Sequence, residues 1–371
     1  MAEQRVIDSD SHVMEVEETW AYLEPEFQHR RPQVVNAPAT PQGSPVDAYW
    51  LVDGQIQPRL RGPGARFTGT PLSSTFARTK PYSVASQAIA DVSARLRDLD
   101  AAGWDVQVLF PTVFLVMLAE DPRLEAALMR SYNTWIAGIV RQAPERLKWV
   151  AVLPLRAVDQ AVAEVRRARE LGAVGVAVYG TAGSRMLHEP EFDPVWAEAE
   201  RQELPVGVHT GWSHPGLTES GTSFLPGIVV GFTLPVLLGF LSFTAGGILD
   251  RFPRLRAGFF EAGADWLPYW VQRMDQYWTV ATWVAPGHPR SARPPSEYLA
   301  SGRLYVTCEG EERLLPQVLE CIGEDQVMVS GDMPHVEARE NVVHEIRERT
   351  DLTDTAKGKL LGANAATFYR I

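Results

Sequence analysis

The feature that most constrains the fold is a regular alternation of short apolar stretches with longer amphipathic segments. Eight stretches have the length and composition of buried strands, and a helical pattern follows almost every one of them. Because strands separated by helices pair in parallel, eight such units predict closure into an α/β barrel, the (β/α)8 or TIM barrel. The strands are expected at 6–9, 106–111, 147–155, 174–178, 205–209, 255–261, 304–307 and 327–330.

The alternative is a doubly wound open sheet. No glycine-rich phosphate turn follows the first strand, which weakens that alternative. At 371 residues the chain is long enough for one large domain, and we expect 1–371 to form a single barrel domain. Helices are expected at 88–102, 122–143, 158–171, 194–203, 235–250, 266–278, 314–322, 340–349 and 354–368.

Residues 15–86 interrupt the alternation after the first strand. This region is rich in proline and irregular, with one expected hairpin at 48–56. A loop of this length needs a function in a compact domain, so we expect an insertion that acts as a lid. Its arginines, Arg59, Arg61 and Arg66, are candidates for holding an anionic substrate, although solvated surface arginines are the simpler interpretation.

The composition indicates which binding partners and which cellular compartment to expect. The formal net charge of −11 disfavours nucleic acid and anionic membrane as partners. Two cysteines, Cys308 and Cys321, form no disulfide framework and indicate a reducing compartment. The N-terminus has no basic flank followed by an apolar core, so we expect no signal peptide and a cytoplasmic protein.

One uncharged segment, 224–249, is long enough to span a bilayer. It contains two prolines and five glycines and has no partner span elsewhere in the chain. We therefore expect a loop followed by a buried helix from Pro235, and no membrane contact.

Acidic residues and histidines gather where the expected strands end. In a TIM barrel the reacting groups lie at these carboxyl ends, on one face. Strand alternation also predicts that Asp8, Asp10 and His12 share one side while Ser9 and Ser11 take the other. Carboxylate and imidazole ligands suit zinc, manganese or ferrous iron. The strand-end residues are Asp10, His12, His209, Glu261, Asp332 and His335.

Each of these residues taken alone has a simpler explanation, such as a satisfied polar group or a helix cap. Their joint occurrence at four strand ends is much harder to explain in that way. His214 is interpreted as a loop histidine, and Cys308 is not interpreted as a nucleophile because no Cys–His pattern accompanies it. Most of the eleven tryptophans are expected in packing rather than in a substrate pocket.

The sequence resembles the amidohydrolase-related family also called amidohydrolase 2. That family includes aminocarboxymuconate-semialdehyde decarboxylase together with other decarboxylases, hydrolases and hydratases. The resemblance covers nearly the whole chain. It is carried by 6–12 (VIDSDSH), 99–103, 209–211 (HTG), 247–253 (GILDRFP), 261–268, 330–335 (SGDMPH) and 364–365.

The resemblance implies that Asp10, His12, His209 and Asp332 bind one divalent metal ion. It ranks zinc first, with manganese and iron close behind. This chain departs from the family at the sixth strand, where many members have a histidine and it has Glu261. Three carboxylates at close range favour a raised pKa or an oxygen-preferring ion. Glu261 is therefore a ligand or a nearby base, and His335 is the expected proton shuttle or supporting donor.

The expected reaction is non-oxidative decarboxylation of a small cyclic or aromatic carboxylic acid. In that reaction Asp332, His335 and Glu261 are the expected catalytic residues. A hydrolase that uses metal-activated water to cleave a lactone, an amide or a C–C bond is the first alternative. A non-catalytic relative that binds a ligand is the second. The family also implies a homodimer.

Overall fold

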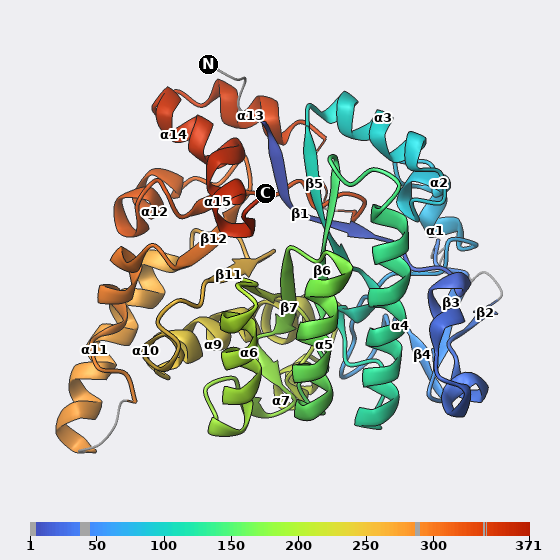
Figure 1. Cartoon of the computed structure of the whole chain (residues 1–371), viewed down its shortest axis with the longest axis horizontal. Helices are drawn as coiled ribbons and strands as arrows, with labels where there is room; N and C mark the ends of the chain where they lie inside the picture. Colours follow the sequence, from blue (N-terminus) through green and yellow to red (C-terminus); the bar gives the residue numbers. More distant parts are fainter. Residues whose placement is uncertain (1–4, 38–44, 286–289, 337, 339) are drawn as a thin grey trace.

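Eight parallel strands form the centre of the molecule (Figure 1). The computed structural model describes residues 5–37, 45–285, 290–336, 338 and 340–371. The strands pair in the order β1-β5-β6-β7-β10-β11-β12-β13. They are β1 (Ile7–Val13), β5 (Val106–Pro111), β6 (Leu147–Val152), β7 (Gly175–Tyr179), β10 (Val206–His209), β11 (Ala257–Phe260), β12 (Leu304–Cys308) and β13 (Val327–Val329). The predicted (β/α)8 barrel is confirmed.

The first and last strands are joined by hydrogen bonds that nearly close the barrel. The Ser9 hydroxyl donates to the carbonyl of Val329 at 2.7 Å, and the backbone NH of Asp332 donates to the carbonyl of Asp10 at 3.1 Å. Pairing between β1 and β5 shifts register between Asp8 and Ser11, which is the signature of a β-bulge. These contacts bring the ends of β1 and β13, which carry predicted site residues, next to each other.

Helices surround the barrel, and many begin at a capping side chain or a proline. Asp91 caps α3 and Asp121 caps α4, each by accepting a backbone NH. The helix predicted to begin at residue 88 begins at Val92 instead. Ile89 has a left-handed φ of 52°, which separates the short helix α2 from α3. The helices flanking the barrel are α3 (Val92–Ala102), α4 (Pro122–Val140), α5 (Val158–Leu171), α6 (Asp193–Arg201), α9 (Leu234–Phe243), α10 (Ile248–Arg251), α11 (Leu267–Val284), α12 (Leu315–Ile322) and α13 (Val342–Glu348).

The C-terminal helices fill one end of the barrel. The run predicted as one helix is α14 (Asp354–Gly358), a π-helical turn η7 (Lys359–Ala363) and α15 (Asn364–Tyr369). Figure 1 shows α15 beside β1 and β12. Phe368 packs against Phe260 and Tyr305 inside the barrel, and the Tyr369 hydroxyl donates to the carbonyl of Ser9. This apolar plug leaves only the opposite end open for a site.

The insertion after β1 contains a small antiparallel sheet and several short helices. The expected hairpin is present as β3 (Ala48–Val52) and β4 (Gln55–Gln57), and a third strand, β2 (Gln33–Asn36), joins it. The sheet lies beside α4, where Arg30 forms ion pairs with Asp53 and Asp121 (Figure 1). The short helices of the insertion are η1 (Glu17–Tyr22), η2 (Pro25–Arg30), α1 (Thr75–Arg78) and α2 (Val84–Gln87).

The apolar segment is helical from Phe224 to Phe243, so the predicted loop before Pro235 is wrong. It consists of α8 (Phe224–Pro226), a π-helical stretch η5 (Gly227–Thr233) and α9. The helix predicted at 235–250 ends at Phe243, and a turn separates it from α10. A proline removes a backbone donor from a helix, and the π-helical stretch accommodates this change just before Pro235. Gly180 lets α9 approach β7, since a Cβ there would lie 1.6 Å from the Pro235 carbonyl oxygen. The helix 224–243 is long and apolar enough to cross a membrane.

The remaining short elements connect these units on both ends of the barrel. They are η3 (Val113–Leu115), β8 (Thr181–Ala182), β9 (Arg185–Met186), η4 (Pro190–Phe192), α7 (Pro215–Ser220) and η6 (Pro295–Ser301).

The barrel plug gives a direct test of the fold. Phe368→Ala removes a fully buried ring, so we expect a loss of about 3–5 kcal/mol of unfolding free energy. The control Tyr269→Ala removes an aromatic side chain that is 62% exposed, and its effect should stay within about 0.5 kcal/mol. Denaturant unfolding followed by circular dichroism measures both. Equal effects of the two variants would contradict the assignment of α15 as the plug.

Candidate metal centre and substrate chamber

The six predicted site residues meet at the open end of the barrel. Their ligating atoms form two overlapping groups that share His12. One group contains Asp10, His12 and His209, and the other contains His12, Glu261, Asp332 and His335. Within each group the ligating atoms lie within 4.8 Å of one another. The four predicted ligands therefore lie close together, although Asp332 belongs to the second group rather than to the first.

The two histidines of the first group are held with one ring nitrogen facing the cluster. His12 Nδ1 lies 2.9 Å from the Pro111 carbonyl, and His209 Nδ1 lies 3.0 Å from the Thr210 carbonyl. A carbonyl accepts only from a protonated nitrogen, so each Nε2 is left as the atom that faces the carboxylates. This arrangement fixes the tautomer that a metal ligand needs.

The distances across the cluster are too long for strong direct hydrogen bonds. His209 Nε2 lies 3.4 Å from Asp10 Oδ1 and 3.2 Å from Glu261 Oε2. His12 Nε2 lies 3.7 Å from Asp10 Oδ1 and 3.4 Å from Asp332 Oδ1. Both carboxylate oxygens of Asp10 and both Nε2 atoms are buried without a hydrogen-bond partner among the described residues.

Such orphaned polar atoms are costly when buried, and a divalent cation would satisfy them together. The donor set of imidazole nitrogens and carboxylate oxygens fits zinc, manganese or iron. The residues present therefore fit a single divalent metal ion.

Burial and nearby charges shift the pKa values of His12 and His209 in opposite directions. Burial, followed by the nearby His335 and His209, holds the pKa of His12 well below its usual range, so its Nε2 carries a lone pair. Burial would also lower the pKa of His209, but Asp10 and Glu261 outweigh it and raise that pKa to about 9. In the metal-free protein His209 thus carries the positive charge that partly balances the carboxylates.

The side chains of Asp332 and His335 lie next to each other beside the cluster. His335 Nδ1 lies 2.8 Å from Asp332 Oδ1, and its Nε2 lies 3.1 Å from the Thr112 hydroxyl. The His335 ring stacks on His12 with a centroid distance of 3.9 Å. Burial, together with the charge of Lys80, keeps the pKa of His335 well below its usual range. A neutral His335 ring therefore lies at contact distance from the Asp332 carboxylate.

Two site residues adopt a backbone conformation that is rare outside glycine. Glu261 has a φ of 56° and Asp332 a φ of 50°, both in the left-handed region. Each follows the last residues of a barrel strand, where the turn aims its side chain toward the cluster. Non-glycine residues persist in this region only where their surroundings hold them, and such residues are frequent at functional sites.

Asp8 lies outside the cluster, which corrects the predicted strict alternation along β1. The bulge places Asp8 with Ser11, whose hydroxyl donates to its carboxylate. The Gln107 side-chain amide and the backbone NH of Gly331 also donate to Asp8. Burial raises the pKa of Asp8 to about 6, opposed by these hydrogen bonds. Asp8 therefore braces β1 against β5 and the end of β13 instead of facing the metal.

Two buried charged side chains hold the backbone next to the cluster, and the sequence analysis did not predict them. Arg95 donates to the carbonyls of His12 and Met333 and to the side chain of Gln107. Glu15 accepts the backbone NH groups of Thr112 and Val113, and burial raises its pKa to about 8. Both residues fix backbone segments that carry site residues. Neither has a sequence pattern that distinguishes it from a surface charge.

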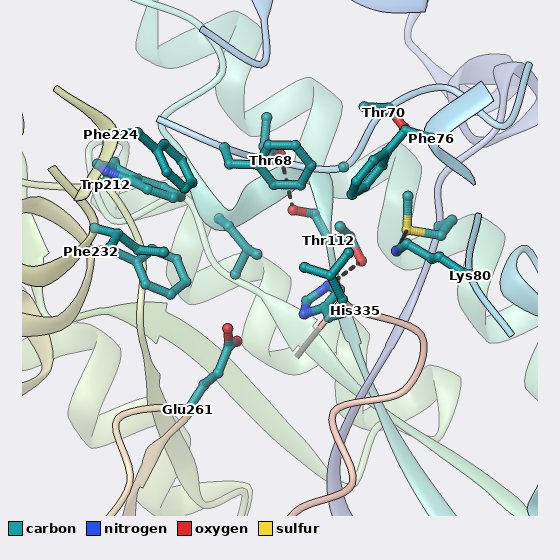
Figure 2. Close-up of a pocket in the computed structure, with 16 residues that line it drawn as sticks. Thr68, Thr70, Phe76, Lys80, Thr112, Trp212, Phe224, Phe232, Glu261 and His335 are labelled. Carbon is teal, nitrogen blue, oxygen red and sulfur yellow. Dashed lines mark hydrogen bonds between the residues drawn. The ribbon is translucent and has the colours of Figure 1, made fainter. Parts of the chain in front are cut away.

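A cavity of about 410 Å³ opens above the metal cluster, with Glu261 and His335 in its wall (Figure 2). We call it the aromatic chamber. Trp212 and Phe232 pack with ring centroids 4.3 Å apart on one side. Phe67, Phe76 and Lys80 come from the insertion and line it elsewhere. Its lining residues are Met14, Phe67, Thr68, Gly69, Thr70, Phe76, Lys80, Thr112, Leu115, Trp212, Phe224, Ile228, Phe232, Glu261, His335 and Val336.

The cationic side chain that lines the chamber is not one of the arginines suggested by the sequence. None of Arg59, Arg61 and Arg66 lines it, and Arg66 instead donates to the side chains of Gln55 and Gln57. Lys80 is the one Lys or Arg side chain among its described lining residues. Since Lys80 is the only lysine of the insertion, its isolation in the sequence is the signal that could have singled it out.

Two other sequence interpretations agree with the structure. His214 caps α7 by accepting the backbone NH of Leu217, so it is a loop histidine. Cys308 is fully buried, and burial raises the pKa of its thiol well above the usual range. A thiol in this environment is a poor nucleophile.

Comparison with known proteins matches this architecture to a family. The family model described as amidohydrolase matches residues 7–371. The chain belongs to the amidohydrolase family. It is 25% identical over 284 residues to 2-amino-3-carboxymuconate-6-semialdehyde decarboxylase of Dictyostelium discoideum, covering 75% of this chain and 76% of that protein. It is 27% identical over 296 residues to gamma-resorcylate decarboxylase of Rhodococcus jostii, covering 75% and 87%.

Solved structures of amidohydrolases share the fold. A Mycobacterium avium amidohydrolase superposes with a TM-score of 0.78 at 20% identity, covering 100% of this chain and 99% of that one. The 5-carboxyvanillate decarboxylase of Novosphingobium aromaticivorans, solved with bound manganese, gives a TM-score of 0.66 at 22% identity, covering 75% of this chain and 80% of that one. These two likenesses establish the barrel architecture.

The metal centre is tested by removing one ligand. His209→Ala should reduce the bound divalent metal of the purified protein to below about a tenth of an equivalent, because metal affinity requires the full ligand set. The control His214→Ala removes a nearby loop histidine and should retain about one equivalent. Elemental analysis after reconstitution measures both. Equal metal content in the two variants would remove His209 from the ligand set.

Proposed function

We propose that this amidohydrolase is a metal-dependent decarboxylase of small aromatic carboxylic acids. The observation that carries the proposal is the position of the buried ligand cluster, which contains the unpartnered atoms of Asp10, His12 and His209 and lies against an aromatic chamber with one cationic side chain, Lys80. A flat ring fits an aromatic-lined cavity of this size, and a lysine pairs with a carboxylate. The decarboxylase relatives reported above support the same reaction.

We assign the metal ion to Asp10, His12, His209 and Asp332, with Glu261 near enough to the histidines to join them. When bound, a divalent ion supplies Lewis-acid stabilisation of negative charge on a substrate oxygen. The sequence ranked zinc first. Three carboxylates at the cluster and the manganese in a similar solved structure favour manganese in the proposal.

Decarboxylation breaks the bond between a ring carbon and its carboxylate, releases CO₂ and forms a C–H bond at the same carbon. The site must therefore deliver one proton to that carbon. We assign its delivery to Asp332, which would take up a proton from solvent, pass it to the ring carbon and return to the carboxylate that lies next to His335. The apolar walls contributed by Phe232, Trp212 and the insertion exclude water from the reacting carbon.

Further expectations from the sequence remain proposals. A lid role for 15–86 is supported by Phe67, Phe76 and Lys80, which this insertion brings to the chamber. A homodimer is supported by exposed apolar residues on α11, where Trp283 is 87% and Val284 77% exposed. A cytoplasmic location is supported by the free thiols of Cys308 and Cys321.

The reaction is tested by CO₂ release. Protein reconstituted with manganese should release CO₂ from members of a panel of hydroxybenzoic acids and muconate-like acids, and the metal-free protein should release none. The ring product should carry one solvent deuteron at the vacated carbon when the reaction is run in D₂O. Turnover of lactones or amides without CO₂ from any acid would replace the decarboxylase with the hydrolase. Stoichiometric ligand binding with no turnover of any compound would favour a non-catalytic relative.

The role of Lys80 is tested by a charge change at constant size. Lys80→Met should raise KM for the carboxylic acid about tenfold with a smaller change in kcat, because a charged contact worth about 1.4 kcal/mol is lost. Lys80→Arg keeps the charge and should recover most of the affinity. Steady-state kinetics of the two variants give the comparison. A KM for Lys80→Met equal to that of the unmodified protein would remove Lys80 from substrate binding.

A further inference from the structure

A second cavity adjoins the aromatic chamber at Glu261. It has a volume of about 260 Å³ and lies between the π-helical stretch η5 and the ends of β11, β12 and β13. The two cavities share Ile228, Phe232 and Glu261 in their walls. A substrate held at the metal cluster can therefore reach into both. We call the second cavity the acidic chamber, after the charged residues that line it.

The charged side chains that line the acidic chamber are all carboxylates. They are Glu261, Glu309 and Asp332, and its described lining contains no lysine, arginine or histidine. The aromatic chamber differs, since its wall contains a cation, Lys80, together with Glu261. Two of the carboxylates belong to the metal cluster, where Asp10 adds a further negative charge. The three carboxylates of the cluster, Asp10, Glu261 and Asp332, carry one more negative charge, when ionised, than a divalent ion balances.

The hydroxyl groups of the acidic chamber strengthen this polarity. The Thr307 hydroxyl donates to the carbonyl of Phe259, the Ser330 hydroxyl to that of Asp10, and the Thr233 hydroxyl to that of Ile228. Each hydroxyl has a single proton, and while that proton is given to a backbone carbonyl these three side chains offer a ligand acceptor lone pairs. The backbone NH of Gly331, which also lines the chamber, is already bound to Asp8.

A carboxylate placed in the acidic chamber would meet like charges and would lose its water without gaining donors from these groups. A phenolic hydroxyl or an amine would find several acceptors there.

We propose that the acidic chamber is a substituent-binding subsite that takes a neutral or cationic hydrogen-bond donor and rejects a second carboxylate. The proposal rests on the proposed function, because it assumes that an aromatic acid occupies the neighbouring chamber. The substrate class is then an aromatic monocarboxylic acid with a hydroxyl or amino group on the ring. Aromatic dicarboxylic acids of the same size are discriminated against.

The test compares the binding of matched ligands to the manganese-loaded protein by calorimetry. The probes are 3-hydroxybenzoate, 3-aminobenzoate and benzene-1,3-dicarboxylate, which differ only in the group at one ring position. The hydroxy and amino acids should bind at least tenfold more tightly than the dicarboxylate. Equal binding of all three, or tighter binding of the dicarboxylate, overturns the proposal.

A charge placed inside the chamber provides the second arm. Thr233→Lys adds a cation to the chamber wall, so the preference against the dicarboxylate should shrink at least tenfold. The matched control Leu225→Lys adds the same charge to the same helical segment, at a residue that is 70% exposed and lines neither chamber. It should leave the preference unchanged. The same change in both variants would show that general charge, and not the subsite, sets the preference.

Glu309→Gln offers a milder alteration of the same chamber, since it replaces an exposed carboxylate by an amide of similar size. It should reduce the discrimination without adding bulk, and an unchanged preference counts against the subsite. Because binding is measured without turnover, failure of the two proposals can be distinguished. A donor preference with no CO₂ release would retain the subsite and remove the decarboxylase, whereas CO₂ release without the preference would do the reverse.

Discussion

The structure depends on the electrostatic balance at the open end of the barrel, where carboxylates and imidazoles converge in a buried space. Asp10 has both carboxylate oxygens buried without a hydrogen bond among the described residues, facing the Nε2 atoms of His12 and His209. Desolvating such groups costs several kcal/mol each unless an opposite charge compensates them. A raised pKa at His209 is one compensation, and a bound cation is the stronger one. The residues around the cluster hold these charged groups in place despite the cost of their burial.

The support comes from rigid backbone rather than from the cluster itself. Arg95 and Asp8 tie β1 to its neighbours from below, and Glu15 holds the turn that carries Thr112. The left-handed conformations of Glu261 and Asp332 direct two carboxylates inward at some conformational cost. Packing of the barrel core and of the C-terminal plug offsets this strain. The result is a pre-formed site whose ligands need little movement to bind an ion or a substrate.

The sequence predicted the barrel and the members of the metal cluster because both follow from one rule, that parallel strands present their ends on the same face. The same rule places Thr112, directly after β5, in the chamber wall, although it was not among the predicted site residues. It failed for Asp8, because a one-residue bulge in β1 turns that side chain away and leaves no mark in residue order. The rule cannot predict the position of Lys80, because this residue reaches the chamber from an irregular insertion and not from a strand end. The helix before Pro235 was missed because a π-helical stretch accommodates a proline that normally ends a helix.

The central claim is that residues far apart in the sequence share one divalent ion. Anomalous diffraction from crystals of the manganese-loaded protein, recorded on both sides of the manganese absorption edge, tests it most directly. The account predicts a single strong peak about 2.0–2.3 Å from Asp10, His12 and His209. No peak at this position, or a peak coordinated by other side chains, would contradict the account.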